Sequence, residues 1–277
     1  MSWITENLQN SLDTWNTRME QIFDLITQSP AEFRGGGIWS VILDINDALK
    51  AIGLALLVLF FLIGVIKTCG SFAEMKRPEV AVKTLIRFAI AKGVVVYGLE
   101  LMLAIFSIVQ GVIATVITKS GVGGVGEAMV LSPEIVEAVG GVGFLDSIPL
   151  WAVSLLGSFF ITVLSIVMLL IVYGRFFRLF LFTAIAPIPL SAFAGEPSQN
   201  IGKSFVKSYA AVCMEGAIIV LACVIFSAFA TAPPVVDADA SAVVQVWSYI
   251  GETIFNMLVL VGMVKMADRV AREIFGL

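Results

Sequence analysis

The sequence predicts an all-α polytopic membrane protein with about five transmembrane helices. Its residues are 59% hydrophobic and only 14% charged, and its mean hydropathy is +0.99. A soluble globular domain has a charged fraction of about a quarter. Several runs of about 20 or more residues carry almost no charge, which is long enough for a helix to cross about 30 Å of hydrocarbon. These runs are apolar on every face, unlike the short alternating strands of a membrane barrel.

We expect two parts in the chain. Residues 1–37 form an outer amphipathic helix and a glycine hinge, and residues 38–277 form a transmembrane helical domain. The predicted spans lie at about 45–66, 88–117, 149–173, 208–231 and 243–264, with a re-entrant segment at 179–194.

The first helix is predicted from apolar residues spaced three and four apart, which share one helical face. They are Ile4, Leu8, Leu12, Trp15, Met19, Ile22 and Ile26. This face either lies on the membrane and packs on the spans, or docks a partner. Gln28-Ser29-Pro30 and three glycines at 35–37 end the helix.

Basic residues set the predicted orientation. The most basic short loop contains Lys67, Lys76, Arg77, Lys83 and Arg87. The positive-inside rule makes this loop cytoplasmic, so the amino terminus lies outside and the carboxyl terminus inside. Five crossings then put 12 of the 17 basic residues in inside segments.

The segment at 179–194 is predicted to enter the membrane and return on the same side. It is short for a span and contains Pro187 and Pro189. If it crossed, Lys203 and Lys207 would lie outside, against the positive-inside rule. The two prolines free backbone carbonyl groups at membrane depth, which only protein or a cavity can satisfy. The break is therefore a structural corner or part of a translocation path.

Charged residues inside the apolar runs are the first candidate site. Within hydrocarbon such a group must be paired or face protein or water. These residues are Lys92, Glu100, Glu215 and Glu252. They form either a polar pathway or pairs between helices or subunits.

The basic residues at the inner ends of the spans are the second candidate site. Arg175 and Arg178 are expected to anchor lipid phosphates or to contact a cytoplasmic partner, since a planar guanidinium suits a phosphate or a carboxylate. We expect the same lipid or partner contacts for Lys203, Lys207, Lys265, Arg269 and Arg272. Asp268 is placed to pair with Arg272 one helical turn away.

Nothing in the sequence indicates catalysis, a cofactor or a metal. The chain has no histidine, and its three cysteines have no paired spacing. The sequence GVGGVG at 121–126 matches the dinucleotide fingerprint, but it follows a membrane helix instead of a strand. We therefore expect a protein that is not an enzyme. It is either a scaffold in a larger transport machine or a self-contained channel or secondary transporter, although only one broken segment is found where transporters often have two.

The stretch GRFFRLFLFTAIAPIPL at 174–190 resembles the TrbL-type polytopic component of conjugative type IV secretion systems. The predicted five spans with an outside amino terminus are similar to that family's topology.

The resemblance implies a structural, channel-forming subunit of the bacterial inner (cytoplasmic) membrane that supports DNA or protein transfer and pilus assembly. It implies a homo-oligomeric ring beside other secretion subunits, secretion ATPases and a pilus subunit, with phospholipid contacts, transient contact with transferred DNA and no catalysis.

Overall fold

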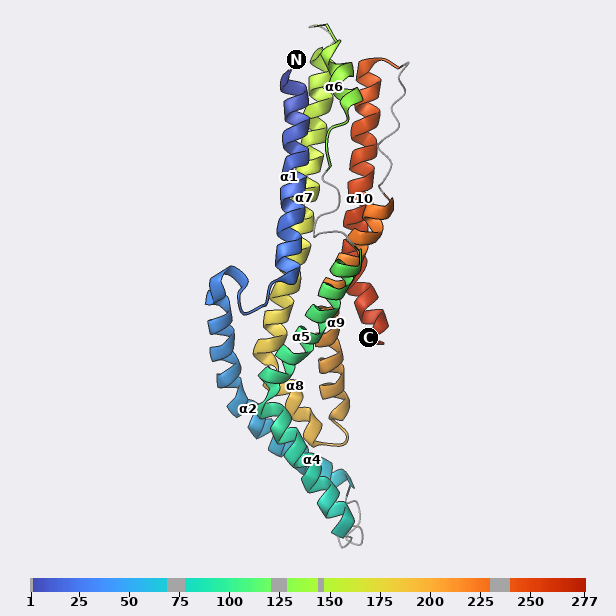
Figure 1. Cartoon of the computed structure of the whole chain (residues 1–277). Coiled ribbons are helices and arrows are strands. Elements are labelled where there is room, and N and C mark those ends of the chain that lie inside the picture. Colours follow the sequence, from blue (N-terminus) through green and yellow to red (C-terminus); the bar gives the residue numbers. More distant parts are fainter. Residues whose placement is uncertain (1, 69–77, 121–128, 144–146, 230–239) are drawn as a thin grey trace. The chain divides into compact units, whose positions relative to one another are not determined.

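The structure, a computed structural model, describes residues 2–68, 78–120, 129–143, 147–229 and 240–277 (Figure 1). Every secondary-structure element of these residues is a helix, so the predicted all-α class is confirmed. The helices are α1 (Ser2–Thr27), η1 (Phe33–Gly36), α2 (Gly37–Thr68), α4 (Pro78–Val96), α5 (Gly98–Ser120), α6 (Pro133–Gly140), α7 (Ser147–Ile185), α8 (Pro187–Ser191), η2 (Ala192–Ala194), α9 (Gln199–Phe229) and α10 (Ala242–Ile274).

Five helical stretches of the described residues are long and apolar enough to cross a membrane, as the sequence predicts. They are Phe33–Lys67, Gly98–Ser120, Ser147–Ile185, Gln199–Ala228 and Ala242–Ile274. Most of them extend beyond the apolar runs, because a helix continues through polar residues of adequate helix propensity. The run at 88–117 is an exception: α4 ends at Val96, and α5 begins at Gly98 after one turn residue.

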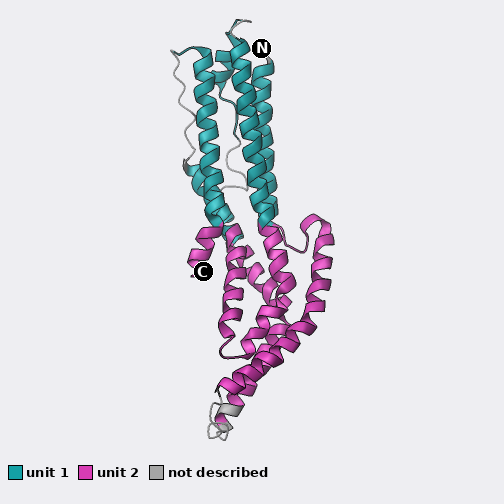
Figure 2. Cartoon of the chain, turned by 180° about the vertical axis from the view of Figure 1, so that it is seen from behind, with its two compact units in different colours: residues 1–27, 113–174, 217–267 teal, residues 28–112, 175–216, 268–277 magenta. Residues whose placement is uncertain are grey.

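Packing divides the chain into two compact units, each built from segments that are distant in sequence (Figure 2). The first unit contains residues 1–27, 113–174 and 217–267, and the second contains 28–112, 175–216 and 268–277. Helix α7 supplies residues 147–174 to the first unit and 175–185 to the second. The sequence predicts a different division, into an outer part at residues 1–37 and a transmembrane part at 38–277. These two units do not test that division, which stays a prediction.

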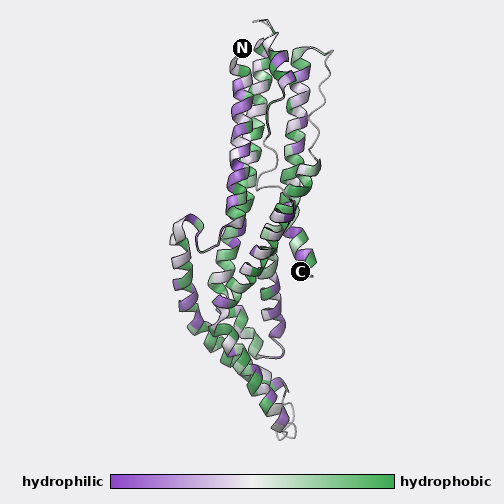
Figure 3. Ribbon diagram, in the orientation of Figure 1, coloured by the Kyte–Doolittle hydropathy of each residue, from purple (hydrophilic) through white to green (hydrophobic). Residues whose placement is uncertain are grey.

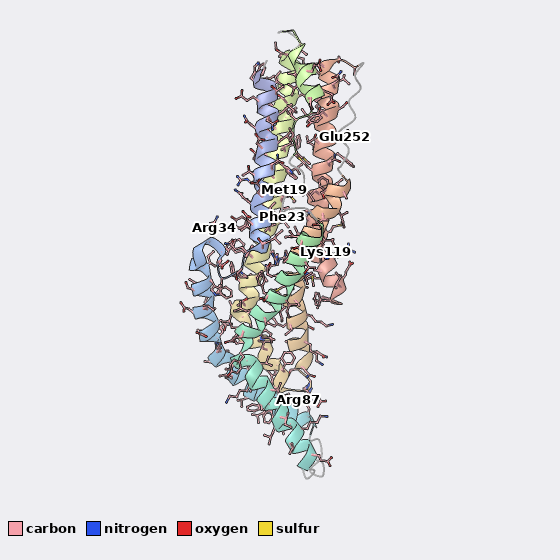
Figure 4. All side chains as sticks on the ribbon, viewed as in Figure 1. Met19, Phe23, Arg34, Arg87, Lys119 and Glu252 are labelled. Carbon is pink, nitrogen blue, oxygen red and sulfur yellow. The ribbon has the colours of Figure 1, made fainter. Side chains whose placement is uncertain are left out.

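In the first unit, α1 contributes its apolar stripe to the core. All seven apolar residues identified on the helix from sequence are buried, and so is Phe23 (Met19 and Phe23 are labelled in Figure 4). Asn16 fixes the chain ahead of α6, since its amide donates to the carbonyl of Met129 at 2.9 Å and accepts from the Met129 backbone N–H at 3.0 Å. Ser132 caps α6 by accepting from the Ile135 N–H.

In the second unit, the hinge after α1 is fixed by an aromatic side chain. The Phe33 ring is buried and stacks on Phe176 with a centroid distance of 4.4 Å. The next two residues, Arg34 and Gly35, have φ angles of +48° and +73°. Glycine adopts this left-handed conformation easily, whereas a residue with a Cβ pays a conformational penalty. The buried ring therefore holds the backbone in a turn that the local sequence only partly favours.

Two glycines let α2 approach the segment after α7. A Cβ at Gly53 would lie 2.6 Å from the Pro187 carbonyl oxygen, and a Cβ at Gly64 would lie 3.1 Å from the Gly195 Cα. Small residues at such contacts are typical of helices packed within membranes. Helix α2 thereby contacts the proline-containing segment near both of its ends. Across the same segment, Arg87 of α4 forms an ion pair with Glu196 at 3.3 Å.

Some sequence features lie outside the described residues. These are the glycine-rich motif at 121–126, the loop basic residues Lys76 and Arg77, Cys69, and the acidic residues Asp237 and Asp239.

Candidate functional site: a helix break and a buried charge network

Helix α7 breaks at Pro187, later than the sequence suggests. The helix runs without interruption from Ser147 to Ile185, so residues 174–185 are its last three turns. The predicted segment at 179–194 therefore begins inside α7 and continues through α8 and η2. The arginine pair does not end the helix, because arginine is a good helix former, whereas proline removes a backbone donor. Whether this segment returns to the same side of the membrane stays a prediction.

Asn46 of α2 replaces the hydrogen bond that Pro187 removes. In a continuous helix the N–H of residue 187 would donate to the Thr183 carbonyl, but proline has no N–H. The Asn46 side-chain amide donates to this carbonyl at 2.7 Å. Asn46 is 1% exposed, and its Oδ1 has no hydrogen-bond partner among the described residues. Both prolines of the break, Pro187 and Pro189, thus belong to a corner that α2 supports.

Arg175 is enclosed within the second unit. Its side chain is 0% exposed, its Nε donates to the Val212 carbonyl at 3.4 Å, and its Nη2 donates to the Cys213 carbonyl at 3.3 Å. Gly216 makes this position possible, because a Cβ there would lie 2.5 Å from the guanidinium carbon. The third nitrogen, Nη1, has no partner within the described residues.

In this structure Arg175 contacts its own chain, so the expected lipid or partner contact of this residue stays a prediction. The positive-inside rule treats an arginine that follows an apolar run as a headgroup anchor. This rule takes no account of a residue such as Gly216 on a neighbouring helix, which leaves space for the arginine side chain.

Arg178 joins three helices of the second unit. Its Nη2 donates to both carboxylate oxygens of Glu215 on α9, at 2.6 and 2.7 Å, and its Nη1 donates to Asp268 on α10. Glu215 is 1% exposed, whereas Arg178 and Asp268 are 29% and 35% exposed. Asp268 also pairs with Arg272 at 3.1 Å, as predicted from their spacing. A carboxylate as enclosed as Glu215 needs such a partner, because an unpaired buried charge is strongly unfavourable.

The remaining predicted residues lie on the surface. Lys203 and Lys207 of α9 are exposed, as are Lys265, Arg269 and Arg272 of α10. Arg269 pairs with Glu273 one turn later at 2.8 Å. The intramembrane candidates Lys92 and Glu100 are exposed on α4 and α5, and Glu252 is exposed on α10 (Figure 4). The structure therefore brings Glu215 together with Arg178 but leaves the other three apart from this network.

The polar side chains around α7 form ion pairs and hydrogen bonds within the protein. Cys213 and Cys223 are buried free cysteines, and within the described ranges no group of three or more His, Cys, Asp or Glu side chains could hold a metal ion. Most of the polar groups instead pair with one another or with the helix backbone, and Asn46 Oδ1 and Arg175 Nη1 are the exceptions among the described residues. They fix α7, α9 and α10 in one arrangement, and Asn46 does the same for the break.

Two functional positions were missed from sequence. Asn46 lies between Asp44 and Asp47, so in the sequence it resembles the polar end of a span, and only its hydrogen bond to the Thr183 carbonyl reveals its role. Gly216 follows Glu215 directly. A glycine beside a buried carboxylate in an apolar run could have indicated close packing there.

We expect the contribution of Asn46 to depend on Pro187. Asn46→Leu leaves the Thr183 carbonyl unpaired and should destabilise the protein by about 1 kcal/mol, the size of an interhelical hydrogen bond in a membrane protein. In a Pro187→Ala background, the alanine N–H can donate to this carbonyl, so the same substitution should have less than half the effect. The measurement is the free energy of unfolding in detergent micelles.

Pro189→Ala is the matched control for this cycle. It restores a donor for the Ile185 carbonyl instead, so it should leave the effect of Asn46→Leu unchanged. Equal effects of Asn46→Leu in the wild-type, Pro187→Ala and Pro189→Ala backgrounds would show that Asn46 does not replace the hydrogen bond that Pro187 removes.

Glu215→Gln should destabilise the protein by about 1.5 kcal/mol, because it replaces two charge-assisted hydrogen bonds from Arg178, which keeps Asp268 as a partner. Glu252→Gln makes the same chemical change at an exposed position of α10 and should alter stability by less than about 0.5 kcal/mol. Unfolding in micelles, followed by circular dichroism, measures both. Similar stabilities of the two variants would show that the Arg178–Glu215 pair does not stabilise the protein.

Comparison with known proteins identifies the family. A family model described as TrbL/VirB6 plasmid conjugal transfer like protein matches residues 15–187, which is more than half of the chain. No curated protein and no solved structure matches the chain. The matched segment includes the second half of α1, the hinge, α2, α4, α5, α6 and α7, with Asn46, both arginines and Pro187. The chain belongs to the TrbL/VirB6 family of plasmid conjugal transfer membrane proteins.

Proposed function

We propose that this protein is a structural and channel-forming subunit of a bacterial type IV secretion or conjugation machine. It supports DNA or protein transfer and pilus assembly from the cytoplasmic membrane, without catalysis of its own. The observation that carries the proposal is the family match over residues 15–187 in a chain with five span-length apolar helices. The channel-forming role and the identity of the machine go beyond the match and are our inference.

Unequal burial of the spans supports an assembly of several copies. In α9, 61% of the most apolar window is buried within the protein, but only 17% of the corresponding window in Phe33–Lys67 is buried. Helix α9 is therefore enclosed by its own chain, whereas α2 offers most of its apolar surface to lipid or to other subunits. We propose a homo-oligomeric ring in contact with phospholipid and with other membrane subunits of the machine.

The exposed charges fit the proposed partners. Lys203, Lys207, Lys265, Arg269 and Arg272 would face headgroups or the secretion ATPases on the cytoplasmic side. Lys92, Glu100 and Glu252 are exposed on apolar helices, and we propose that they pair across subunits or border the translocation path. The pilus subunit would contact the outer part of the protein at residues 1–37. The transferred DNA would pass along the translocation path.

We propose that the amino terminus lies outside and the carboxyl terminus in the cytoplasm, with the segment at 179–194 re-entrant. The cover that α2 gives to α8 supports this arrangement, since irregular backbone at membrane depth requires contact with protein. Helices α8 and η2 together contain only eight residues before the turn to α9 at Gln199. Such a length is too short to cross the hydrocarbon.

Thiol labelling tests this topology. In a variant whose native cysteines are replaced, Gln199→Cys should react with a membrane-impermeant maleimide only after the cells are permeabilised. Glu137→Cys, at an exposed position of α6 in the predicted outer loop, is the matched control and should react in intact cells. Labelling of Gln199→Cys in intact cells would overturn the re-entrant arrangement and the orientation of the last two helices.

Deletion of the gene tests the function. Plasmid transfer should fall to the level of a strain without the secretion machinery and should return when the wild-type gene is supplied in trans. Uptake of small solutes should not change. If transfer frequency is unaffected while solute uptake falls, the protein is a self-contained channel or secondary transporter, and the secretion proposal is wrong.

A further inference from the structure

The charges around Glu215 are unevenly distributed. Arg175 and Arg178 are the two charged residues of α7, and Figure 3 shows mostly hydrophobic ribbon along this helix. Arg178 is 29% exposed, and it pairs with both Glu215 and Asp268. Arg175 is 0% exposed, and its hydrogen bonds among the described residues go only to backbone carbonyls. The more enclosed of the two cations is therefore the one without a carboxylate.

The contacts of Arg175 are weak for an enclosed guanidinium. Its bonds to the carbonyls of Val212 and Cys213 measure 3.4 and 3.3 Å. A bond from a guanidinium to a carboxylate is about 2.7–2.9 Å long and roughly twice as strong as one between neutral groups. The rings of Phe106 and Phe176 lie 6.0 and 5.9 Å from its Cζ, at the limit of the cation–π attraction. Because Nη1 has no partner in the described part of the chain, the cation still lacks an anionic partner.

Glu215 lies on the turn of α9 that contacts Arg175. The guanidinium binds the backbone carbonyls two and three residues before Glu215, and it lies against Gly216, the residue directly after it. The charge of Glu215 also acts on Arg175. Arg178 follows Arg175 by three residues on α7, so the two arginines share one helical face. A glutamate side chain has three rotatable bonds, and its rotation brings the carboxylate from one arginine to the other.

We propose that Glu215 is a switching carboxylate that exchanges between Arg178 and Arg175. In the arrangement of this structure, Glu215 and Asp268 both pair with Arg178, so this arginine links α9 to the end of α10. In the second arrangement Glu215 pairs with Arg175, and Arg178 keeps Asp268. Each arginine then has one carboxylate, and the partly exposed Arg178 replaces its lost bonds with water. This inference goes beyond the proposed function and does not depend on it.

The exchange changes how the end of α10 is held. While Glu215 pairs with Arg178, the ion pairs of the network tie this end of the helix to both α7 and α9. After the exchange, the pair between Arg178 and Asp268 ties it to α7 alone. Asp268 also pairs with Arg272 at 3.1 Å, and Arg272 is exposed. The network therefore connects the surface of α10 with the enclosed side chain of Arg175.

A double-mutant cycle in detergent micelles tests the exchange. Arg178→Gln should raise the equilibrium constant for unfolding by at most about fivefold, because Glu215 then pairs with Arg175. In an Arg175→Met background the same substitution leaves Glu215 buried without a counter-charge, so it should raise the constant by at least about a hundredfold. If Glu215 does not move, Arg178→Gln has the same effect in both backgrounds. Effects that agree within about threefold would overturn the inference.

Arg269→Gln is the matched control for this cycle. It removes an exposed arginine that pairs with Glu273 on the same helix. It should therefore change the unfolding constant equally in the wild-type and Arg175→Met backgrounds.

Nuclear magnetic resonance of the protein labelled with ¹⁵N-arginine tests the exchange without the Arg175→Met variant. The chain has eight arginines, so their guanidinium signals can be assigned from spectra of single variants. In Arg178→Gln the guanidinium protons of Arg175 should move downfield relative to the wild type, because a bond to a carboxylate is shorter than one to a carbonyl. An unchanged Arg175 signal would overturn the inference.

The effect on α10 is tested by the distance between two spin labels in the second unit. The labels are placed at the exposed positions Lys207→Cys on α9 and Glu273→Cys on α10, with the native cysteines replaced. The distances should spread over a wider range in this labelled protein than in its Arg175→Met variant, in which Glu215 stays on Arg178. Equal widths would show that no exchange of Glu215 reaches α10, and this part of the inference would be wrong.

Discussion

Polar groups enclosed among apolar helices must be satisfied inside the protein, and in the second unit this constraint acts mainly on α7. Water in the interior of a membrane protein is scarce, so an unmet donor, acceptor or charge has no substitute partner. Arg178 is satisfied by carboxylates from α9 and α10. These two ion pairs form only when α7, α9 and α10 lie next to one another. They therefore help to determine how the three helices are arranged as well as how stable the arrangement is.

The same constraint explains the corner after α7. A proline at 187 ends the helix and leaves the Thr183 carbonyl without its usual donor. Asn46 supplies a donor, and it can do so only because Gly53, two turns later on α2, lets that helix approach the corner closely. The break is therefore a junction between two parts of the chain, 137 residues apart, that hold each other in position.

Sequence reasoning succeeded for properties that depend on composition and spacing. Long apolar runs predict five span-length helices because the cost of exposing backbone polar groups leaves few alternatives in lipid, and the apolar stripe of α1 predicts its buried face. The position of Arg175 could not be predicted, since it depends on space beside Gly216, far along the chain. The partner of Glu215 could not be predicted from sequence either. Its need for a pair follows from burial, but the choice of Arg178 follows from the packing of α7 on α9.

The extent of the family match bears on how this network is built. The matched residues 15–187 contain Arg175, Arg178 and Asn46, whereas Glu215, Gly216 and Asp268 lie beyond its end. The matched residues thus include the enclosed Arg175 and the partly exposed Arg178, whereas the carboxylates and the glycine that accommodate them lie on α9 and α10. Helices α9 and α10 therefore supply the carboxylates that pair with Arg178 of α7. Because these contacts join α7 to the two carboxyl-terminal helices, we expect substitutions on either side of them to be coupled in their effects on stability.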